Sequence, residues 1–413
     1  MTVKEQFDGL KAEAAKAMYQ LTLAEVPELV AVRRPLVFSV DSQLFPEISI
    51  AANLTVDNLI LLGGIGIMGP QSQINAKIDK VTDFGIESRA CNAIRLAQYN
   101  ILSGILPVPD ALVLVNSACD GMNALSRIAE SYKPWSKVPR FIVNVPYGTD
   151  DEDFVYLGEQ LKKLNAFLET VTGKKTDSQR LHEISVESNK QLQLMLELQE
   201  LKRARPFPLD FTVLNMTWAL KSWVASTKPS LYPWITDWLE RALLAGENAY
   251  RAGKGLEGIS EKIRFLWYDA TPAWSSELFP RLTQELGAVC VSNYYTNFYD
   301  IPLDLSSVDS FYTSAAKKYV LATPMIRQSL HSADLYCEDL LKSVRDYKCD
   351  AVLLGHVGHR TQNAMSQLAR EMCQRNNIPF ECIGQENFDD RYMSPDAVFD
   401  KFKTLFEVTG LTK

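Results

Sequence analysis

The chain has no apolar run near the ~20 residues needed to cross a bilayer, no block of lysine or arginine, and no cysteine pair at C-x-x-C spacing. A net charge of −7 and the missing basic block argue against nucleic-acid binding. No G-x-x-x-x-G-K-[ST] motif is present, so this chain is not expected to bind ATP itself. The N-terminus is a charged amphipathic helix rather than a signal sequence. These absences predict a cytoplasmic protein without a membrane span.

Seven cysteines without paired spacing are not typical of a disulfide framework. We expect most of them to be buried, reduced and inert, with Cys290 in a strand and Cys337 and Cys373 on helices. Two cysteines differ in their setting. Cys91 opens an amphipathic run that predicts a helix, and Cys119 follows the apolar run Ala111–Val115, which is typical of a buried parallel strand. Chemistry gathers at the carboxyl ends of such strands, and helix N-termini favour thiolates.

At 413 residues the chain can form two or three domains. Strands and helices are predicted to alternate before residue 150 and again after residue 258, with long helices between. We predict an α/β fold with two doubly wound parallel-sheet domains joined by a helical connector. The predicted limits are residues 1–150, including an N-terminal helix that packs elsewhere, then 151–258 and 259–413. A cleft between the strand-end loops of the two halves is the expected site.

A glycine-rich stretch follows the strand predicted over Asn58–Leu62. Gly64, Gly66 and Gly69 match G-x-G-x-x-G, and Glu87 lies at a distance suited to a ribose. However, Pro70 follows directly, and the strand is the second of its domain rather than the first. A loop beside a site is the favoured interpretation, and a nucleotide-dependent oxidoreductase is an alternative.

Stretches along nearly the whole chain resemble one enzyme family. They are 88–94 (SRACNAI), 106–120 (LPVPDALVLVNSACD), 145–150 (VPYGTD), 172–183 (TGKKTDSQRLHE), 269–274 (DATPAW), 287–300 (GAVCVSNYYTNFYD), 349–359 (CDAVLLGHVGH) and 379–394 (PFECIGQENFDDRYMS). In order and spacing they resemble the 2-hydroxyacyl-CoA dehydratase and benzoyl-CoA reductase subunits, with the larger substrate-side reductase subunit most similar. The resemblance implies two Rossmann-like halves with a [4Fe–4S] cluster between them, held by three cysteines.

Cys91 and Cys119 match the first two cluster ligands that this resemblance implies. The third should follow Leu354, where the chain has Gly358 and His359 instead. His359 is the expected replacement, since histidine substitutes for cysteine in other clusters. Two alternatives stay open: a ligand from another cysteine or a partner chain, or a subunit that has lost the cluster and only completes an interface.

The resemblance also implies a substrate and partners. An ATP-dependent iron–sulfur activator would supply a low-potential electron, which the cluster would pass to a CoA thioester, and a related subunit would form a heterodimer. Ser42, Trp274 and Tyr294 are the expected substrate-binding residues, although each aromatic ring can equally pack at a domain interface. We find no acidic residue near 61–64 that matches the dehydratase members. An oxidoreductase subunit is therefore favoured, and a dehydratase, which is a lyase, is the runner-up.

Overall fold

The computed structural model describes residues 2–22, 35–60, 70–88, 90–253, 255–256, 258–268, 277–324, 326–327, 333–355, 360–384 and 386–411. Within these ranges the strands form two four-stranded parallel sheets. The first has the order β2-β1-β3-β4, with strands β1 (Leu36–Ser39), β2 (Thr55–Asn58), β3 (Ala111–Asn116) and β4 (Arg140–Asn144). The second has the order β6-β5-β7-β8, with strands β5 (Ile263–Trp267), β6 (Ala288–Asn293), β7 (Ala351–Gly355) and β8 (Phe380–Ile383). The two sheets repeat one strand order, which confirms the predicted α/β class.

One predicted strand is wrong. The apolar run Asn58–Leu62 suggests a strand, but β2 ends at Asn58, and Leu59 and Ile60 are helical. The register explains the difference, because β2 pairs residue for residue with β1 and Asn58 lies opposite its last residue, Ser39. Residues 61–69, which include Gly64, Gly66 and Gly69, lie outside the described residues.

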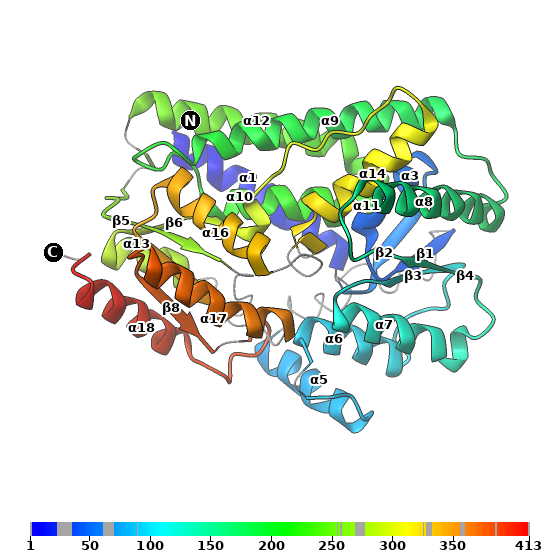
Figure 1. Ribbon diagram of the computed structural model, residues 1–413, viewed down its shortest axis with the longest axis horizontal. Helices are drawn as coiled ribbons and strands as arrows, with labels where there is room; N and C mark the ends of the chain where they lie inside the picture. Colours follow the sequence, from blue (N-terminus) through cyan, green and yellow to red (C-terminus); the bar gives the residue numbers. More distant parts are fainter. Residues whose placement is uncertain are drawn as a thin grey trace.

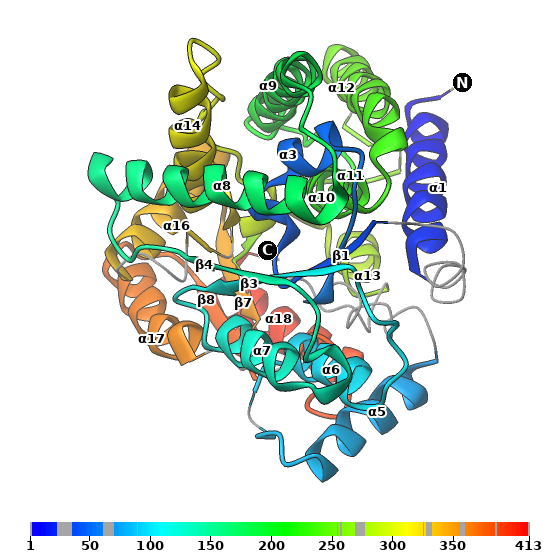
Figure 2. The ribbon, with the colours of Figure 1, turned by 90° about the vertical axis from the view of Figure 1, so that its right-hand side faces the viewer.

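Helices cover both faces of the first sheet, as a parallel sheet requires. Figure 2 shows the sheet nearly edge-on, with α6 and α7 on one side and α3 and α8 on the other. The elements of this half are η1 (Ser42–Leu44), α3 (Pro46–Ala51), α5 (Gln71–Asp83), α6 (Asn92–Leu102), α7 (Asp120–Ser131) and η3 (Lys133–Trp135).

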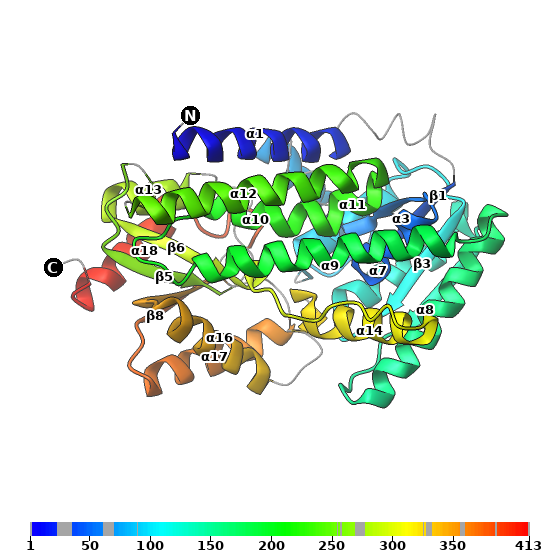
Figure 3. The same ribbon diagram turned by 90° about the horizontal axis from the view of Figure 1, so that it is seen from above.

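A set of long helices connects the two halves, and α9 and α12 run along both sheets (Figures 1 and 3). The connecting elements are α8 (Asp151–Thr172), α9 (Ser178–Leu201), α10 (Phe211–Ala219), the π-helical turn η4 (Leu220–Val224), α11 (Ala225–Thr227), η5 (Pro229–Leu231) and α12 (Tyr232–Ala252). The N-terminal helix α1 (Val3–Thr22) packs on α12. There, Trp238 Nε1 donates to the carbonyl of Leu10 at 3.1 Å.

The second half contributes a helix that reaches back to the first. A Cβ atom at Gly158 of α8 would lie 3.1 Å from the carbonyl oxygen of Tyr312, so α8 and α14 are in close contact (Figure 2). A single buried cluster includes Val113 of β3 and Leu354 of β7, which makes the core continuous between the halves. The remaining elements are α13 (Leu278–Leu286), η6 (Tyr294–Thr296), α14 (Val308–Ala322), α16 (Ala333–Tyr347), α17 (Arg360–Arg375) and α18 (Pro395–Val408).

Three cysteines outside the predicted site lie where the sequence placed them. Cys290 is buried in β6, and Cys337 and Cys373 are buried on α16 and α17. Across the described ranges, no helix combines the length and apolar character needed to cross a membrane. The domain limits 1–150, 151–258 and 259–413 remain a prediction.

Candidate functional site

The two predicted thiol ligands occupy equivalent positions on neighbouring helices. Cys91 is the N-cap residue of α6, and Cys119 is the N-cap residue of α7, directly after β3. Both are buried, with 7% and 6% of their surfaces exposed. Because the N-terminal end of a helix dipole favours negative charge, both sulfur atoms lie at positions suited to thiolate ligands.

The first turns of α6 and α7 pack against each other. A Cβ atom built on Gly121 would lie 2.8 Å from Cγ1 of Ile94, closer than real Cβ contacts allow. Gly121 and Ile94 are two and three residues beyond their N-cap cysteines. The absence of a side chain at Gly121 therefore brings together the two turns that carry Cys91 and Cys119.

A carboxylate from the far end of the chain closes over the start of α6. Glu386 Oε1 accepts the backbone N–H of Asn92 at 3.0 Å, and Oε2 accepts that of Phe388 at 2.8 Å. Burial raises the pKa of Glu386, and these hydrogen bonds oppose that shift. Arg95 is also buried and donates to the Asn92 side chain at 2.9 Å. Cys91 thus lies where the loop after β8 meets the first half.

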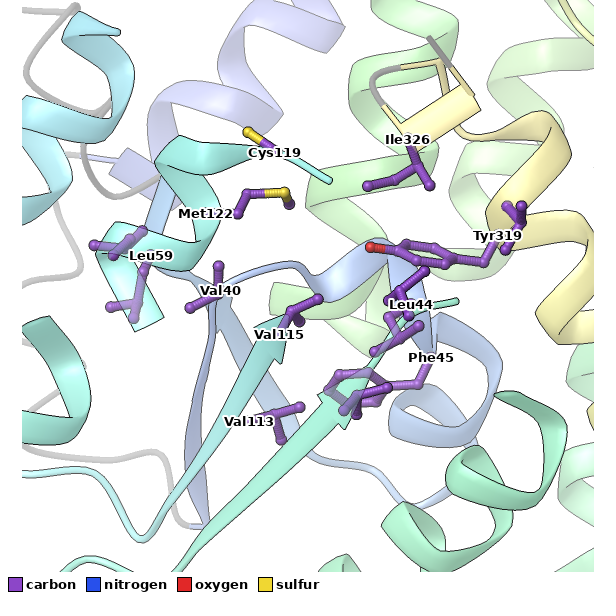
Figure 4. Close-up of a cluster of buried hydrophobic side chains, with 14 of the residues drawn as sticks. Val40, Leu44, Phe45, Leu59, Val113, Val115, Cys119, Met122, Tyr319 and Ile326 are labelled. Atoms are coloured by element: carbon purple, nitrogen blue, oxygen red, sulfur yellow. The ribbon is translucent and has the colours of Figure 1, made fainter. Parts of the chain in front are cut away.

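Cys119 lies beside a buried acid and a phenol. Tyr319 Oη donates to Asp41 Oδ2 at 3.0 Å, and Figure 4 shows the Tyr319 hydroxyl directed toward the strand ends where Cys119 and Met122 lie. Burial raises the pKa of Tyr319, and the charges of Asp41 and Cys119 add to that shift. Burial also raises the pKa of Asp41, against hydrogen bonds from Gln43 and Tyr319. The hydrogen-bonded Tyr319 and Asp41 therefore place an ionisable O–H group next to the Cys119 thiol.

Ser42 lies just beyond the end of β1, and 1% of its surface is exposed. Its hydroxyl donates to the carbonyl of Ser222 at 3.4 Å and accepts from Asn58 Nδ2 at 3.4 Å. Asn58 is the last residue of β2. Ser42 therefore bridges the edge of the first sheet and the π-helical turn of the connector.

Tyr294 is buried at the start of η6, directly after β6. Its ring centroid lies 4.2 Å from that of Tyr295, which stacks on Trp218 at 4.2 Å. Trp218 contacts Trp223 in turn at 4.7 Å. Tyr294 is thus one end of an aromatic row that continues into the connector.

His359 and Trp274 lie outside the described residues. Within the ranges that are described, no group of three or more His, Cys, Asp or Glu side chains is arranged to hold a metal ion. The structure therefore brings the turns of Cys91 and Cys119 together, and it places Ser42 and Tyr294 at strand ends of different halves.

A pocket opens beside Ser42, where both halves and the connector meet. It has an empty volume of about 660 Å³, part of which is open to solvent. Apolar side chains dominate the lining, which consists of Gln43, Pro46, Leu192, Met195, Trp218, Lys221, Ser222, Phe298, Tyr299, Ile301, Lys318, Ala322, Thr323 and Pro324.

Two lysines line this pocket, and sequence analysis missed both. Lys318 pairs with Glu47 in a short contact and donates to Ser188 Oγ at 3.1 Å. Lys221 donates to the Ser188 carbonyl at 3.1 Å. Burial lowers the pKa of Lys221 to about 7, the charge of Lys318 acts in the same direction, and Glu47 opposes it. Neither lysine could be singled out from the sequence, because a single lysine in a polar or helical stretch is usually solvent-exposed.

Comparison with known proteins assigns the family. The model of the 2-hydroxyglutaryl-CoA dehydratase, D-component family matches residues 44–408, which is most of the chain. The chain belongs to this family. A benzoyl-CoA reductase subunit from Thauera aromatica is 26% identical over 324 residues, covering 73% of this chain and 71% of the reductase subunit. Both descriptions are of components of enzymes, so the D-component family indicates an enzyme subunit of dehydratase or reductase type, and the resemblance predicted from sequence is confirmed.

Proposed function

We propose that this D-component relative is the iron–sulfur subunit of a low-potential CoA-thioester reductase similar to benzoyl-CoA reductase. The observation that carries the proposal is the pairing of Cys91 and Cys119 at the N-caps of two helices in contact. Two buried thiols at the carboxyl edge of a parallel sheet fit the donor set of an iron–sulfur cluster. We assign the third ligand to His359, and the cluster type to [4Fe–4S].

The bound cluster would supply a low-potential electron to a CoA thioester. The chain's own residues then have defined tasks. Glu386 holds the N-terminus of α6, and so the backbone of Cys91, at a fixed position. Tyr319 and Asp41 keep a proton next to Cys119. Ser42, Trp274 and Tyr294 would bind the thioester. A related subunit would complete a heterodimer, and a separate ATP-dependent iron–sulfur activator would be the electron donor.

A dehydratase subunit is the second candidate. The matching family model is named for a dehydratase component, and a serine hydroxyl, Ser42, lies at the end of β1 beside the pocket. The two candidates share the cluster and differ in the reaction. Dehydration of a 2-hydroxyacyl-CoA without net electron consumption would favour the dehydratase, whereas stoichiometric oxidation of the activator would favour the reductase.

The decisive experiment is iron and sulfide analysis with EPR on anaerobically purified protein. Cys91→Ala and Cys119→Ala should each lose most of the iron, whereas Cys290→Ala, the same change at an equally buried cysteine of the second half, should keep it. His359→Ala tests the third ligand separately. Wild-type protein without iron would overturn the cluster and favour the alternative of a cluster-free partner subunit. Iron retained in both Cys91→Ala and Cys119→Ala would overturn the ligand assignment.

A further inference from the structure

The pocket beside Ser42 contains two lysines in different surroundings. Lys318 pairs with Glu47, which also accepts a hydrogen bond from Ser188 Oγ at 2.6 Å. Lys221 lines the same pocket, is partly exposed, and donates to the Ser188 carbonyl at 3.1 Å. Within the described ranges this carbonyl is the only hydrogen-bond partner of Lys221. Glu47 is thus engaged by one lysine, whereas the other contacts a neutral acceptor.

These surroundings favour the neutral amine form of Lys221. Burial and the charge of Lys318 lower the pKa of Lys221 to about 7, and Glu47 acts against that shift. The other titratable groups near it are the phenols of Tyr299, which lines the pocket, and Tyr232, and burial raises the pKa of both. At neutral pH about half of the Lys221 side chains therefore have a free lone pair, compared with roughly one in 2,500 for an ordinary lysine.

A neutral amine in this position has the properties of a nucleophile. Lysines become nucleophilic when they are desolvated or lie next to another cation, and Lys221 meets both conditions. The hydrogen bond to the Ser188 carbonyl uses one N–H group and leaves the lone pair available. Apolar side chains of the same pocket, from Leu192, Met195 and Ile301, offer a surface for a hydrocarbon chain. The pocket thus combines an amine that can attack a carbonyl with a wall that suits an acyl group.

We propose that Lys221 is an acylation site, at which a CoA thioester in this pocket transfers its acyl group to Nζ. The Lys221 nitrogen attacks the thioester carbonyl carbon, the C–S bond breaks, and an amide bond forms. The amine loses one proton and the released CoA thiolate takes one up, so the step needs no oxidant or reductant. The amide leaves the acyl group in the pocket and stops a further thioester from entering. The inference rests on the proposed function in one respect, namely that the acyl donor is a CoA thioester.

The test uses the purified full-length chain, together with any subunit that copurifies, and two acetyl donors. Acetyl-CoA and S-acetyl-N-acetylcysteamine carry the same thioester, but the second lacks the nucleotide part of CoA. Peptide mass spectrometry at pH 7 should find Lys221 acetylated about 10-fold or more faster than exposed Lys174, because far more of the Lys221 amine is neutral. Lys318 is the matched control inside the pocket and should stay unmodified, because it is paired with Glu47.

The acetylation rate of Lys221 should level off above about pH 8, whereas the rate at an ordinary lysine rises about tenfold per pH unit. Unfolding the protein in urea should abolish the difference between Lys221 and Lys174. Equal rates at these two lysines in the folded protein, with both donors, would overturn this inference and leave the proposed function in place, because that function is tested by iron content. Selective reaction with S-acetyl-N-acetylcysteamine alone would overturn CoA as the acyl donor and would contradict the CoA-thioester substrate of the proposed function as well.

Discussion

Glu386 accepts the backbone N–H of Asn92 at 3.0 Å, although 294 residues separate them. The contact attaches the loop after β8 to the residue that follows Cys91. Removal of the carboxylate would leave a buried N–H group without its partner. We expect Glu386→Ala to lower the free energy of unfolding by roughly 1–3 kcal/mol. Urea denaturation monitored by circular dichroism would measure this change in the free energy of unfolding.

The matched comparison is Asp79→Asn. This change breaks an exposed ion pair in which Asp79 lies 2.8 Å from Arg391 of the same loop. Exposed pairs contribute about 0–1 kcal/mol. If Glu386→Ala costs no more than Asp79→Asn, the buried contact does not fix the start of α6.

Gly121 should not tolerate alanine. Alanine normally favours a helix over glycine by about 0.5–1 kcal/mol, but here its Cβ would meet Ile94 Cγ1 at 2.8 Å. Overpacking of this kind costs about 1–3 kcal/mol, so we expect net destabilisation. If the proposed function is correct, the variant should also lose iron. The double variant Gly121→Ala/Ile94→Ala removes the clash. A double-mutant cycle with a favourable coupling energy would verify the contact, and additive effects would contradict it.

Lys318 forms an ion pair with buried Glu47. Burial acts to raise the pKa of Glu47, but the charge and hydrogen bond of Lys318, with that of Ser188, keep the pKa below its ordinary value. Lys318→Met should therefore destabilise the protein by about 3–5 kcal/mol at neutral pH, and adding Glu47→Gln should recover part of that loss.

The pH dependence of this loss has a definite sign. Because the folded-state pKa of Glu47 lies below its unfolded value of about 4.3, the stabilisation is complete above that value and disappears as the pH falls through the folded-state pKa. Unfolding curves of wild type and Lys318→Met should converge on acidification. A difference that stays constant down to pH 3 would argue against the pair.

Lys221 should also make stability rise with pH, but in the neutral to alkaline range. Its pKa is about 7 in the folded protein and about 10.4 when unfolded, so the folded state binds fewer protons between these values. Wild-type stability relative to Lys221→Met should then rise as the pH increases from 7 toward 10. Denaturation midpoints at pH 6.5, 8 and 9.5, with Lys174→Met as control, would measure the trend. A flat difference would mean that Lys221 keeps its ordinary pKa.

The sequence could predict the parts of the fold that depend on apolar patterning. Ala111–Val115 is apolar on both faces and bounded by turn residues, and β3 spans almost the same residues. The strand β2 was missed because its last two residues, Asp57 and Asn58, are polar although buried. In a short parallel strand the register with its neighbour decides the boundary, and no local pattern encodes that register.

In the candidate site too, the sequence predicts only features that have a local signal. The cysteines could be placed at helix starts because a strand or turn precedes each, but Glu386 and Lys221 could not be connected to them. Glu386 contacts α6 only because two halves fold against each other. Lys221 gains its low pKa from the enclosure that α3, α9 and α14 create. Long-range proximity of this kind leaves no local trace in a single sequence.

A one-residue deletion in the π-helical turn Leu220–Val224 would change the pocket wall of this enzyme subunit. A π turn contains one residue more than the α-helical path would need. Deleting a single residue there would rewind the segment as an ordinary helix and rotate the preceding side chains by about 100° relative to the following ones. Trp218 would then leave the wall that Ser222 completes. One codon in the connector could thus reshape this pocket wall while both sheets stay intact.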